Sequence, residues 1–214
     1  MDTKRFLVEI FNGDGLIASI MYGSDGADFI EGTSLDDIIF AKEGANNVLG
    51  NDGDDTIDGG QGADRISGGD GGDTLTGGAG ADVFVQGNGD SVAYTAQTAF
   101  SANTLVAAGT IVFANSVDVI TDFNNGGLDL IDVATAADLT ILAADNGSDP
   151  LELGRNYLIR GVFDANTSLF TQSDTGIDAL ILFNAQNPVL EAADNNNWLV
   201  ATGAGASLVA ANFI

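Results

Sequence analysis

The sequence predicts an all-β protein built around a parallel β-roll, a coil whose short strands stack into two facing sheets. An N-terminal cap and a mainly antiparallel C-terminal β region are expected to complete the fold. Two observations support this prediction. A nine-residue repeat occurs seven times between Tyr22 and Phe84 without insertion or deletion. Beyond it, runs of aliphatic and aromatic residues alternate with Asn, Asp and Gly turns, a pattern typical of strands.

Two positions of the repeat carry its pattern. Position seven is Asp or Asn, and position nine is always apolar. The repeats begin at Tyr22, Glu31, Phe40, Leu49, Asp58, Ser67 and Thr76; their seventh residues are Asp28, Asp37, Asn46, Asp55, Asp64, Asp73 and Asp82; their ninth residues are Ile30, Ile39, Val48, Ile57, Ile66, Leu75 and Phe84. A flexible Gly/Asp linker has no reason to keep an apolar residue at every ninth position, so the period indicates a folded coil.

Each repeat divides into a six-residue turn and a three-residue strand. The strand points its ninth side chain inward, because side chains alternate across a strand. Glycines at positions two, three and five allow positive φ and bring carbonyl oxygens close to one point. Two repeats complete one coil, so turns two repeats apart stack at a spacing of about 4.8 Å. A cation fits between such turns.

The oxygen atoms of these turns predict calcium sites. Ca²⁺ prefers about 6 to 8 oxygen ligands, and zinc fits poorly because the chain has no His and no Cys. The candidate ligands are the position-seven side chains together with the turn glycines Gly50, Gly53, Gly59, Gly60, Gly62, Gly68, Gly69, Gly71, Gly77, Gly78 and Gly80. Pairing seventh positions two repeats apart predicts about five ions, at Asp28/Asn46, Asp37/Asp55, Asn46/Asp64, Asp55/Asp73 and Asp64/Asp82.

These positions are not equal. Asn46 lacks a carboxylate, and Ala41 and Leu35 replace turn glycines in the third and second repeats. The strongest sites are therefore expected late in the array, at Asp55/Asp73 and Asp64/Asp82.

The charge of the array supports a role for metal. Residues 22–84 carry fourteen acids and two bases, a net charge of −12, which five Ca²⁺ would nearly cancel. Without the metal, charge repulsion and glycine entropy are expected to leave the segment unfolded.

The repeats resemble the nonapeptide G-G-x-G-x-D-x-U-x of the RTX (repeats-in-toxin) family of secreted calcium-binding proteins. The last three repeats match it most closely, in the stretches that begin at Gly59, Gly68 and Gly77. The resemblance implies a right-handed, calcium-binding β-roll in a protein that is secreted to the extracellular space or cell surface. It also implies export by a type I secretion apparatus, which reads an uncleaved C-terminal signal.

Composition argues against nucleic-acid binding, a usual signal peptide and a membrane span. The chain of 214 residues has a formal charge of −25 and only six Lys and Arg, so no basic patch is available for nucleic acid. Residues 1–11 are interrupted by Glu9 and lack a small-residue cleavage site, unlike a usual signal peptide. The longest uncharged run, residues 91–117, is too polar for a membrane span.

Residues 1–21 are expected to form the cap. They are too apolar for a free tail, and a solenoid needs its first coil covered. Phe29, Ile38 and Phe40 stand at outward positions of the first repeats, so residues 5–21 are expected to lie against them. A subunit interface is the alternative for this apolar surface.

A second motif, DVITDFNNGGLDLID, spans Asp118 to Asp132. It resembles a segment that follows the array in many RTX proteins, with one extra residue in its turn. Asp118, Asp122 and Asp129 are expected to face that turn, and Asp122 and Asp129 are candidate ligands of a further cation. A solvated acidic turn is the alternative.

The array, residues 22–93, is expected to be followed by a capping β region, residues 94–214. Its strands are predicted at Tyr157–Phe163, Ala179–Phe183 and Asn197–Ala201, with a short helix at Ala137–Asp145. The tail, Ala206–Ile214, resembles the ends of type I secreted proteins.

The absence of His and Cys limits the functions that the chain can perform. Without His or Cys, the common catalytic triads and His-based zinc sites are excluded, and calcium geometry or turns account for every clustered Asp. We expect no enzyme, but a secreted structural protein that self-associates into extracellular matrix, filament or surface coat as a homo-oligomer or larger assembly. One alternative is a monomeric calcium-dependent adhesin or glycan-binding module with the later sheet as its binding face. Another is a secretion and folding module of a larger protein.

Overall fold

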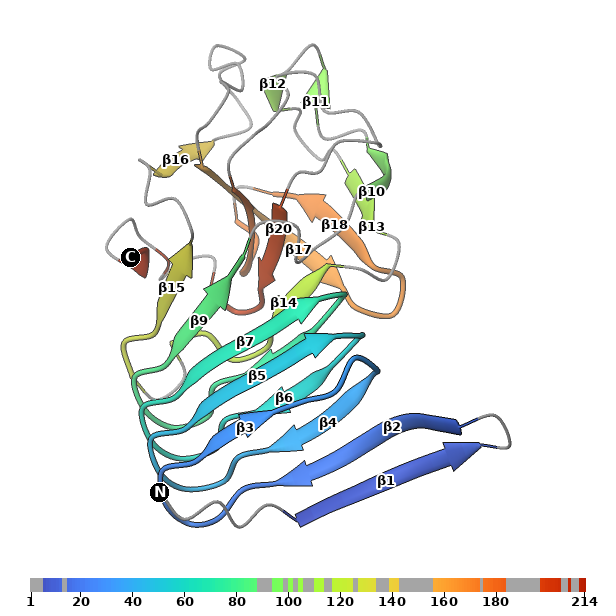
Figure 1. Cartoon of the computed structure of the whole chain (residues 1–214). Helices are drawn as coiled ribbons and strands as arrows, with labels where there is room; N and C mark the ends of the chain where they lie inside the picture. The colour runs from blue at the N-terminus through green and yellow to red at the C-terminus, as the bar shows by residue number, and fades with distance from the viewer. Residues whose placement is uncertain are drawn as a thin grey trace.

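The computed structural model of the chain is built almost entirely of β-strands (Figure 1). It describes residues 6–12, 15–87, 94–97, 100–101, 104–105, 110–113, 117–124, 127–133, 139–142, 156–173, 175–183, 197–204, 208 and 212–214. The predicted all-β fold, with a parallel roll and an antiparallel C-terminal region, is confirmed. No helix among these residues has the length and apolar character needed to cross a bilayer.

The roll consists of two parallel sheets that the chain visits in alternation. The first sheet stacks β2 (Gly15–Tyr22), β4 (Asp37–Phe40), β6 (Thr56–Asp58), β8 (Thr74–Thr76) and β14 (Asp118–Ile120); the second stacks β3 (Phe29–Glu31), β5 (Asn47–Asp52), β7 (Arg65–Asp70), β9 (Val83–Gln86) and β15 (Leu130–Val133). Partner residues in the array are 18 apart, as Val48 opposite Ile66 illustrates. Two nine-residue repeats therefore make one coil, as the sequence predicts.

The position-nine side chains fill the space between the two sheets. Each is at most 2% exposed. Above them, Phe84 packs on Phe123, with ring centroids 6.2 Å apart. Because side chains alternate, the neighbouring residues of each strand face outward. The core therefore consists of one row of position-nine side chains from each sheet.

Backbone glycine at fixed positions allows the turns to stack closely. Gly60, at position three, has φ of 94°, and a Cβ placed on it would lie within 3.0 Å of the Lys42 carbonyl of the turn below. Lys42 and Asn51 adopt positive φ at the same position of their own repeats. Ser24 and Thr33 occupy position three in the first two repeats, where no positive φ occurs.

The N-terminal segment is a β-hairpin that extends the first sheet. β1 (Phe6–Asn12) pairs antiparallel with β2, and β2 pairs parallel with β4. Ser19 and Met21 thereby take positions seven and nine of a preceding coil. The expected packing of residues 5–21 against the outward apolar residues is wrong for Phe29 and Ile38, which stay 41% and 38% exposed. The hairpin covers the hydrogen-bonding edge of the sheet instead of its face.

The roll continues beyond an insertion. After β9 the chain leaves the coil and returns at residue 117, where β14 pairs with β8 and β15 pairs with β9, both parallel. The Asp118–Asp132 motif is therefore a further coil of the same roll, with Ile120 and Ile131 fully buried at its position-nine places.

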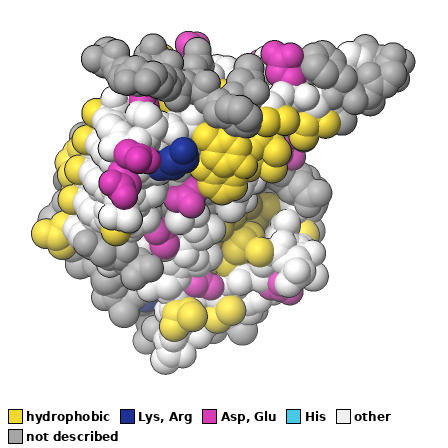
Figure 2. Space-filling model, turned by 90° about the horizontal axis from the view of Figure 1, so that it is seen from below, with side chains coloured by type: hydrophobic (Ala, Val, Ile, Leu, Met, Phe, Trp, Pro, Cys, Tyr) yellow, Lys and Arg dark blue, Asp and Glu magenta, His cyan; other side chains and the backbone are white. Residues whose placement is uncertain are grey.

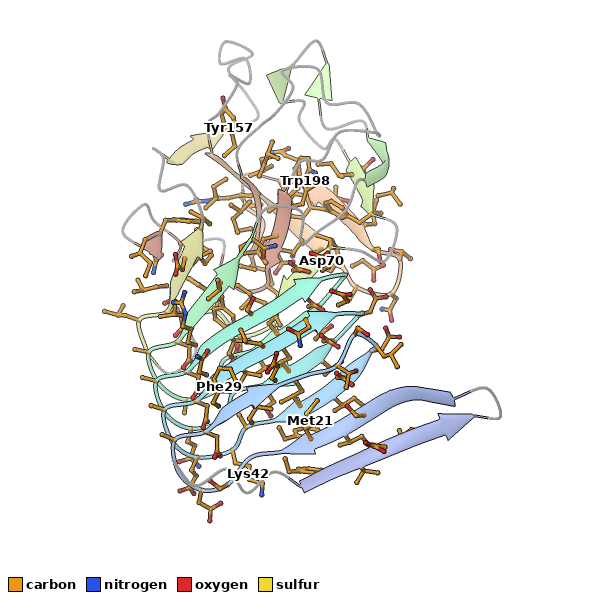
Figure 3. All side chains as sticks on the ribbon, viewed as in Figure 1. Met21, Phe29, Lys42, Asp70, Tyr157 and Trp198 are labelled. Carbon is orange, nitrogen blue, oxygen red and sulfur yellow. The ribbon has the colours of Figure 1, made fainter. Side chains whose placement is uncertain are left out.

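The C-terminal region continues the first sheet from β14 through β20 (Asn197–Ala201), β19 (Asp178–Phe183), β17 (Asn156–Asp164), β18 (Leu169–Gln172), β13 (Thr110–Phe113) and β10 (Tyr94–Gln97). The strands predicted in residues 157–201 are confirmed, and β17, β18 and β19 pair antiparallel. One face of the sheet joins the core of the roll, and the other packs around Trp198 (Figure 3).

The predicted helix at residues 137–145 is wrong where the structure describes it. β16 (Leu139–Leu142) is a strand that pairs parallel with β17. The apolar residues of this segment are compatible with a helix or a strand, and the pairing with β17 makes it a strand. Two short strands, β11 (Phe100–Ser101) and β12 (Thr104–Leu105), form a hairpin. Most of the tail, residues 206–214, lies outside the described residues, as do residues 88–93 at the end of the array.

Candidate metal centre

The turns of the roll stack into two columns, one along each edge of the coil. Their position-seven side chains are buried, with at most 7% exposure. The first column holds Asp28, Asn46, Asp64, Asp82 and Asp129, and the second holds Asp37, Asp55, Asp73 and Asp118. The Asp122–Asp129 turn and Asp118 thus extend the columns built by the repeats.

One oxygen of each side chain forms a ladder that runs up its column. The backbone N–H of each position-seven residue donates to Oδ1 of the residue one coil above, over 2.7 to 3.0 Å in both columns. In the second column, for example, Asp37 donates to Asp55, and Asp55 donates to Asp73. The ladder fixes the orientation of every carboxylate and leaves Oδ2 for another partner.

In four repeats this second oxygen has no partner. Oδ2 of Asp55, Asp64, Asp73 and Asp82 is buried and accepts no hydrogen bond from the residues that the structure describes. A buried, unpaired carboxylate oxygen is costly unless a cation or donor satisfies it. These four residues are the pairs expected from the sequence to form the strongest sites.

Carbonyl oxygens converge on the same places. A Cβ placed on Gly50 would lie within 3.0 Å of both Asp55 Oδ2 and the Gly68 carbonyl oxygen, and Gly59 is related in the same way to Asp64 Oδ2 and the Gly77 carbonyl oxygen. Position-two glycine is therefore required for this close approach. Oxygen atoms that approach one another without a hydrogen between them create a place for a hard cation.

Most ligands at such a place would be backbone atoms. Among the described residues, no three acidic side chains form a metal-binding group. Interturn backbone hydrogen bonds engage carbonyls at positions one, three, four and seven. The position-two carbonyls lie instead beside the carboxylates. Of the predicted glycines, those at position two, Gly50, Gly59, Gly68 and Gly77, lie against the four unpaired oxygens.

The comparison with protein families identifies the array. The model of the RTX calcium-binding nonapeptide repeat (4 copies) matches residues 22–57, 31–66 and 58–92. Residues 22–92 are RTX repeats. The resemblance seen in the sequence is confirmed, and RTX repeats in general bind Ca²⁺. The match indicates no catalytic family.

Solved structures similar to the chain include two subunits of the Azotobacter vinelandii mannuronan C5-epimerase. The AlgE6R3 subunit is 22% identical, with 90% of this chain and 80% of that chain covered and a TM-score of 0.27. The AlgE6R2 subunit is 24% identical, with 90% of each chain covered and a TM-score of 0.34. No curated protein sequence matches the chain.

At the N-terminal end of the RTX array, hydroxyl groups and backbone N–H groups satisfy the carboxylates. The Ser24 N–H donates to Asp28 Oδ2 over 2.6 Å, and the Ser24 hydroxyl donates over 2.9 Å. Thr33 makes the same two bonds to Asp37 Oδ2, at 2.6 and 3.0 Å. Because both residues replace a position-three glycine, the first two repeats supply protein donors at the places where later repeats leave an oxygen unpaired.

At the other end, amide groups and backbone N–H groups have the same effect. Gln86 Nε2 donates to Asp118 Oδ2 over 2.7 Å, and the Asn124 N–H donates to Asp129 Oδ2 over 2.6 Å. The Asp122 carboxylate accepts from the N–H groups of Gly77 and Gly78 at 2.9 and 2.8 Å. Asp122 and Asp129 are therefore hydrogen-bonded within the fold, and an extra cation there remains a prediction.

Burial raises the pKa of every carboxyl with an unpaired oxygen. The pKa of Asp55 rises to about 7, that of Asp64 and Asp82 to about 6, and that of Asp73 to about 9, with desolvation the largest cause in each case. Neighbouring carboxylates add to the shift, as Asp118 does for Asp73. These environments disfavour a negative charge that has no counter-charge, and a bound cation would supply one.

The sequence placed Asp118 at one turn with Asp122 and Asp129, but Asp118 lies in the second column and Asp129 in the first. Sequence reasoning also did not name Ser19 as the end of the second column. Ser19 donates its N–H to Asp37 Oδ1 over 3.0 Å. Its repeat lacks the glycine pattern, and Asp118 lies beyond the insertion. The spacing from Asp118 to Ile120 does repeat the position-seven to position-nine spacing, and this signal was available in the sequence.

Proposed function

We propose that this chain is a secreted calcium-binding structural protein whose RTX array folds when it meets extracellular Ca²⁺. The observation that carries the proposal is the set of four buried, unpaired Oδ2 atoms. Position-two carbonyl oxygens lie close by at Asp55 and Asp64. The donor set suits Ca²⁺, which takes carboxylate and carbonyl oxygens in flexible geometry. Bound calcium would supply positive charge at Asp55, Asp64, Asp73 and Asp82.

The geometry supports one ion for each unpaired carboxylate, or about four, where pairing the seventh positions suggested about five. Hydroxyl and backbone donors already satisfy Asp28 and Asp37, which removes the reason for an ion at those turns. The extracellular space suits the proposal, because calcium modules that act there have dissociation constants of about 10⁻⁴ to 10⁻³ M. Export by a type I apparatus is part of the same proposal.

Calorimetric titration of the full chain with Ca²⁺ is expected to give about four ions per chain. Asp55→Asn or Asp64→Asn should each lose one, because the substituted amide offers no charge. Asp37→Asn and the exposed control Asp25→Asn should retain the parental number. A lower count in Asp37→Asn would contradict the assignment.

Self-association is the second part of the proposed function. The N-terminal end of the roll presents apolar side chains to solvent: Val8, Ile10, Phe29 and Ile38 are 37 to 41% exposed. Figure 2 looks at this end from below and shows hydrophobic groups gathered beside acidic ones. Here Tyr22 stacks on Phe40 with centroids 5.3 Å apart, and the Lys42 ammonium lies 5.8 Å from the Tyr22 ring centroid. Exposed apolar surface and an edge strand, β1, favour contacts between chains.

Size-exclusion chromatography with light scattering is expected to show mass that grows with protein concentration in millimolar calcium. Phe29→Ser with Ile38→Ser should weaken this growth. Val162→Ser should not, because Val162 is exposed on β17, which the strand order separates from the N-terminal hairpin. A monomer at every concentration would contradict self-association.

A calcium-folded monomer that binds sugar would support the adhesin alternative. The groove for such a ligand would be the one of about 400 Å³ lined by Thr74, Phe163 and Asn166.

A further inference from the structure

We propose that the side-chain amide of Asn46 takes the place of a metal ion in the third repeat, so that the first column is closed to cations at this turn. The inference rests on the proposed function, since it takes the unpaired Oδ2 positions as the cation sites. It concerns a repeat in which the position-seven side chain has no charge.

The ladder fixes how the amide of Asn46 is oriented. Asn46 Oδ1 accepts the N–H of Asp28 over 3.0 Å, the same kind of bond that Asp55 and Asp73 accept through Oδ1 in the second column. Nδ2 must therefore stand where the other repeats place Oδ2. An acceptor in those repeats is a donor here.

Both hydrogens of Nδ2 are used on carbonyl oxygens. Nδ2 donates to the Gly44 carbonyl over 3.2 Å and to the Gly59 carbonyl over 3.3 Å. Gly59 occupies position two of the repeat one coil above, as Gly77 does relative to Asp64. The amide thus donates hydrogen bonds to carbonyl oxygens, including the position-two carbonyl of Gly59. The equivalent carbonyl, that of Gly77, lies beside the unpaired Oδ2 of Asp64. A cation at this turn would have to displace those hydrogen bonds and would find no carboxylate charge.

A second observation, in the same repeat, points the same way. Position two is Gly in six of the seven repeats, and Ala41 is the exception. In each of the other six repeats, a Cβ at position two would lie within 3.0 Å of the carboxylate Oδ2, as Gly68 would with Asp73. Ala41 is fully buried in the core. The third repeat has therefore lost the carboxylate and the glycine that makes room for it together.

The array consequently has two parts. In repeats one to three, Ser24, Thr33 and Asn46 complete the position-seven environment with protein donors. In repeats four to seven, the corresponding oxygens are unpaired. The metal positions form one uninterrupted block, and the coils below it are complete without metal.

The test restores the site and counts ions. Asn46→Asp combined with Ala41→Gly replaces both missing features, and calorimetric titration with Ca²⁺ alone is expected to show one more ion than the parent chain. Ala41→Gly alone is the matched control and should leave the count unchanged. A double variant with no additional ion would overturn the inference. Binding of no calcium by the parent or any variant would instead refute the proposed function.

A second variant tests whether Asn46 takes the place of the ion through Nδ2 or binds the ion through Oδ1. Asn46→Ala removes Nδ2 and leaves the Gly44 and Gly59 carbonyls without their donor, so its melting temperature should fall in saturating calcium. Its ion count should equal that of the parent. Loss of one ion in Asn46→Ala would show that Asn46 binds the metal through Oδ1, and would overturn the inference.

Discussion

Removal of calcium is expected to unfold the RTX array from its later repeats. In a chelator at pH 7.5, backbone amides of β6, β7 and β8 should lose protection from hydrogen exchange, while those of β17 and β19 should keep most of it. Each ion held at ten times its dissociation constant stabilises the folded state by about 1.4 kcal/mol, so four contribute roughly 6 kcal/mol. A whole domain is stable by only about 5 to 15 kcal/mol.

The physical reason is the position of the unpaired carboxylates. Asp55, Asp64, Asp73 and Asp82 lie in the turns between β5 and β9, whereas the antiparallel strands β17 and β19 have their own core around Trp198. Amides of β2 and β4 should respond less than those of β6 to β8, because Thr33 satisfies Asp37 without metal. Exchange mass spectrometry with and without calcium resolves these segments. Equal loss of protection in β4 and β7 would contradict the division of the array, and unchanged protection throughout would contradict its dependence on metal.

The period of the array made the roll and its columns predictable. An apolar residue at every ninth position and an acid or amide at every seventh fix which side chains share the core and which share an edge. The departures from the repeat were informative too, because Asn46 and Ala41 marked a weak site before any geometry was known. Local chemistry repeated at constant spacing needs no long-range information.

Features that depend on distant pairing were not predictable in this way. The sequence of residues 88–117 does not predict that the chain leaves the roll and then returns to pair β14 with β8. The sequence showed that Ser24 and Thr33 break the glycine pattern, but not that their hydroxyl groups would satisfy Asp28 and Asp37. The N-terminal hairpin shows the same limit, since its apolar residues suit both the face and the edge of a sheet.

Acid is expected to stabilise the metal-free array. Burial raises the folded-state pKa of Asp64 and Asp82 to about 6, of Asp55 to about 7 and of Asp73 to about 9, all above the ordinary value of 3.8. Protons therefore bind the folded state more tightly than the unfolded one. The resulting stabilisation is fully present below about pH 4 and is lost as the pH rises through these folded-state values.

The melting temperature in a chelator, followed by circular dichroism between pH 5 and pH 9, should therefore fall as the pH rises. Calcium should flatten this dependence, because the bound ion compensates the carboxylate charge that protons neutralise in its absence. Calcium binding near pH 7 should also release protons into a weak buffer. A metal-free chain that is equally stable at pH 5 and pH 9 would contradict this account.

Asp73→Asn separates the buried carboxyls from general charge repulsion. Its amide can accept the Asp55 N–H, as Asp73 Oδ1 does over 2.8 Å, but cannot ionise. The variant should therefore lose less stability than the parent between pH 7 and pH 9 in chelator, and should bind one Ca²⁺ fewer. Asp70→Asn removes the same charge from an exposed position and should follow the parent in both measurements. Identical curves for Asp73→Asn and Asp70→Asn would assign the pH dependence to net charge alone, and not to the pKa of Asp73, which desolvation raises.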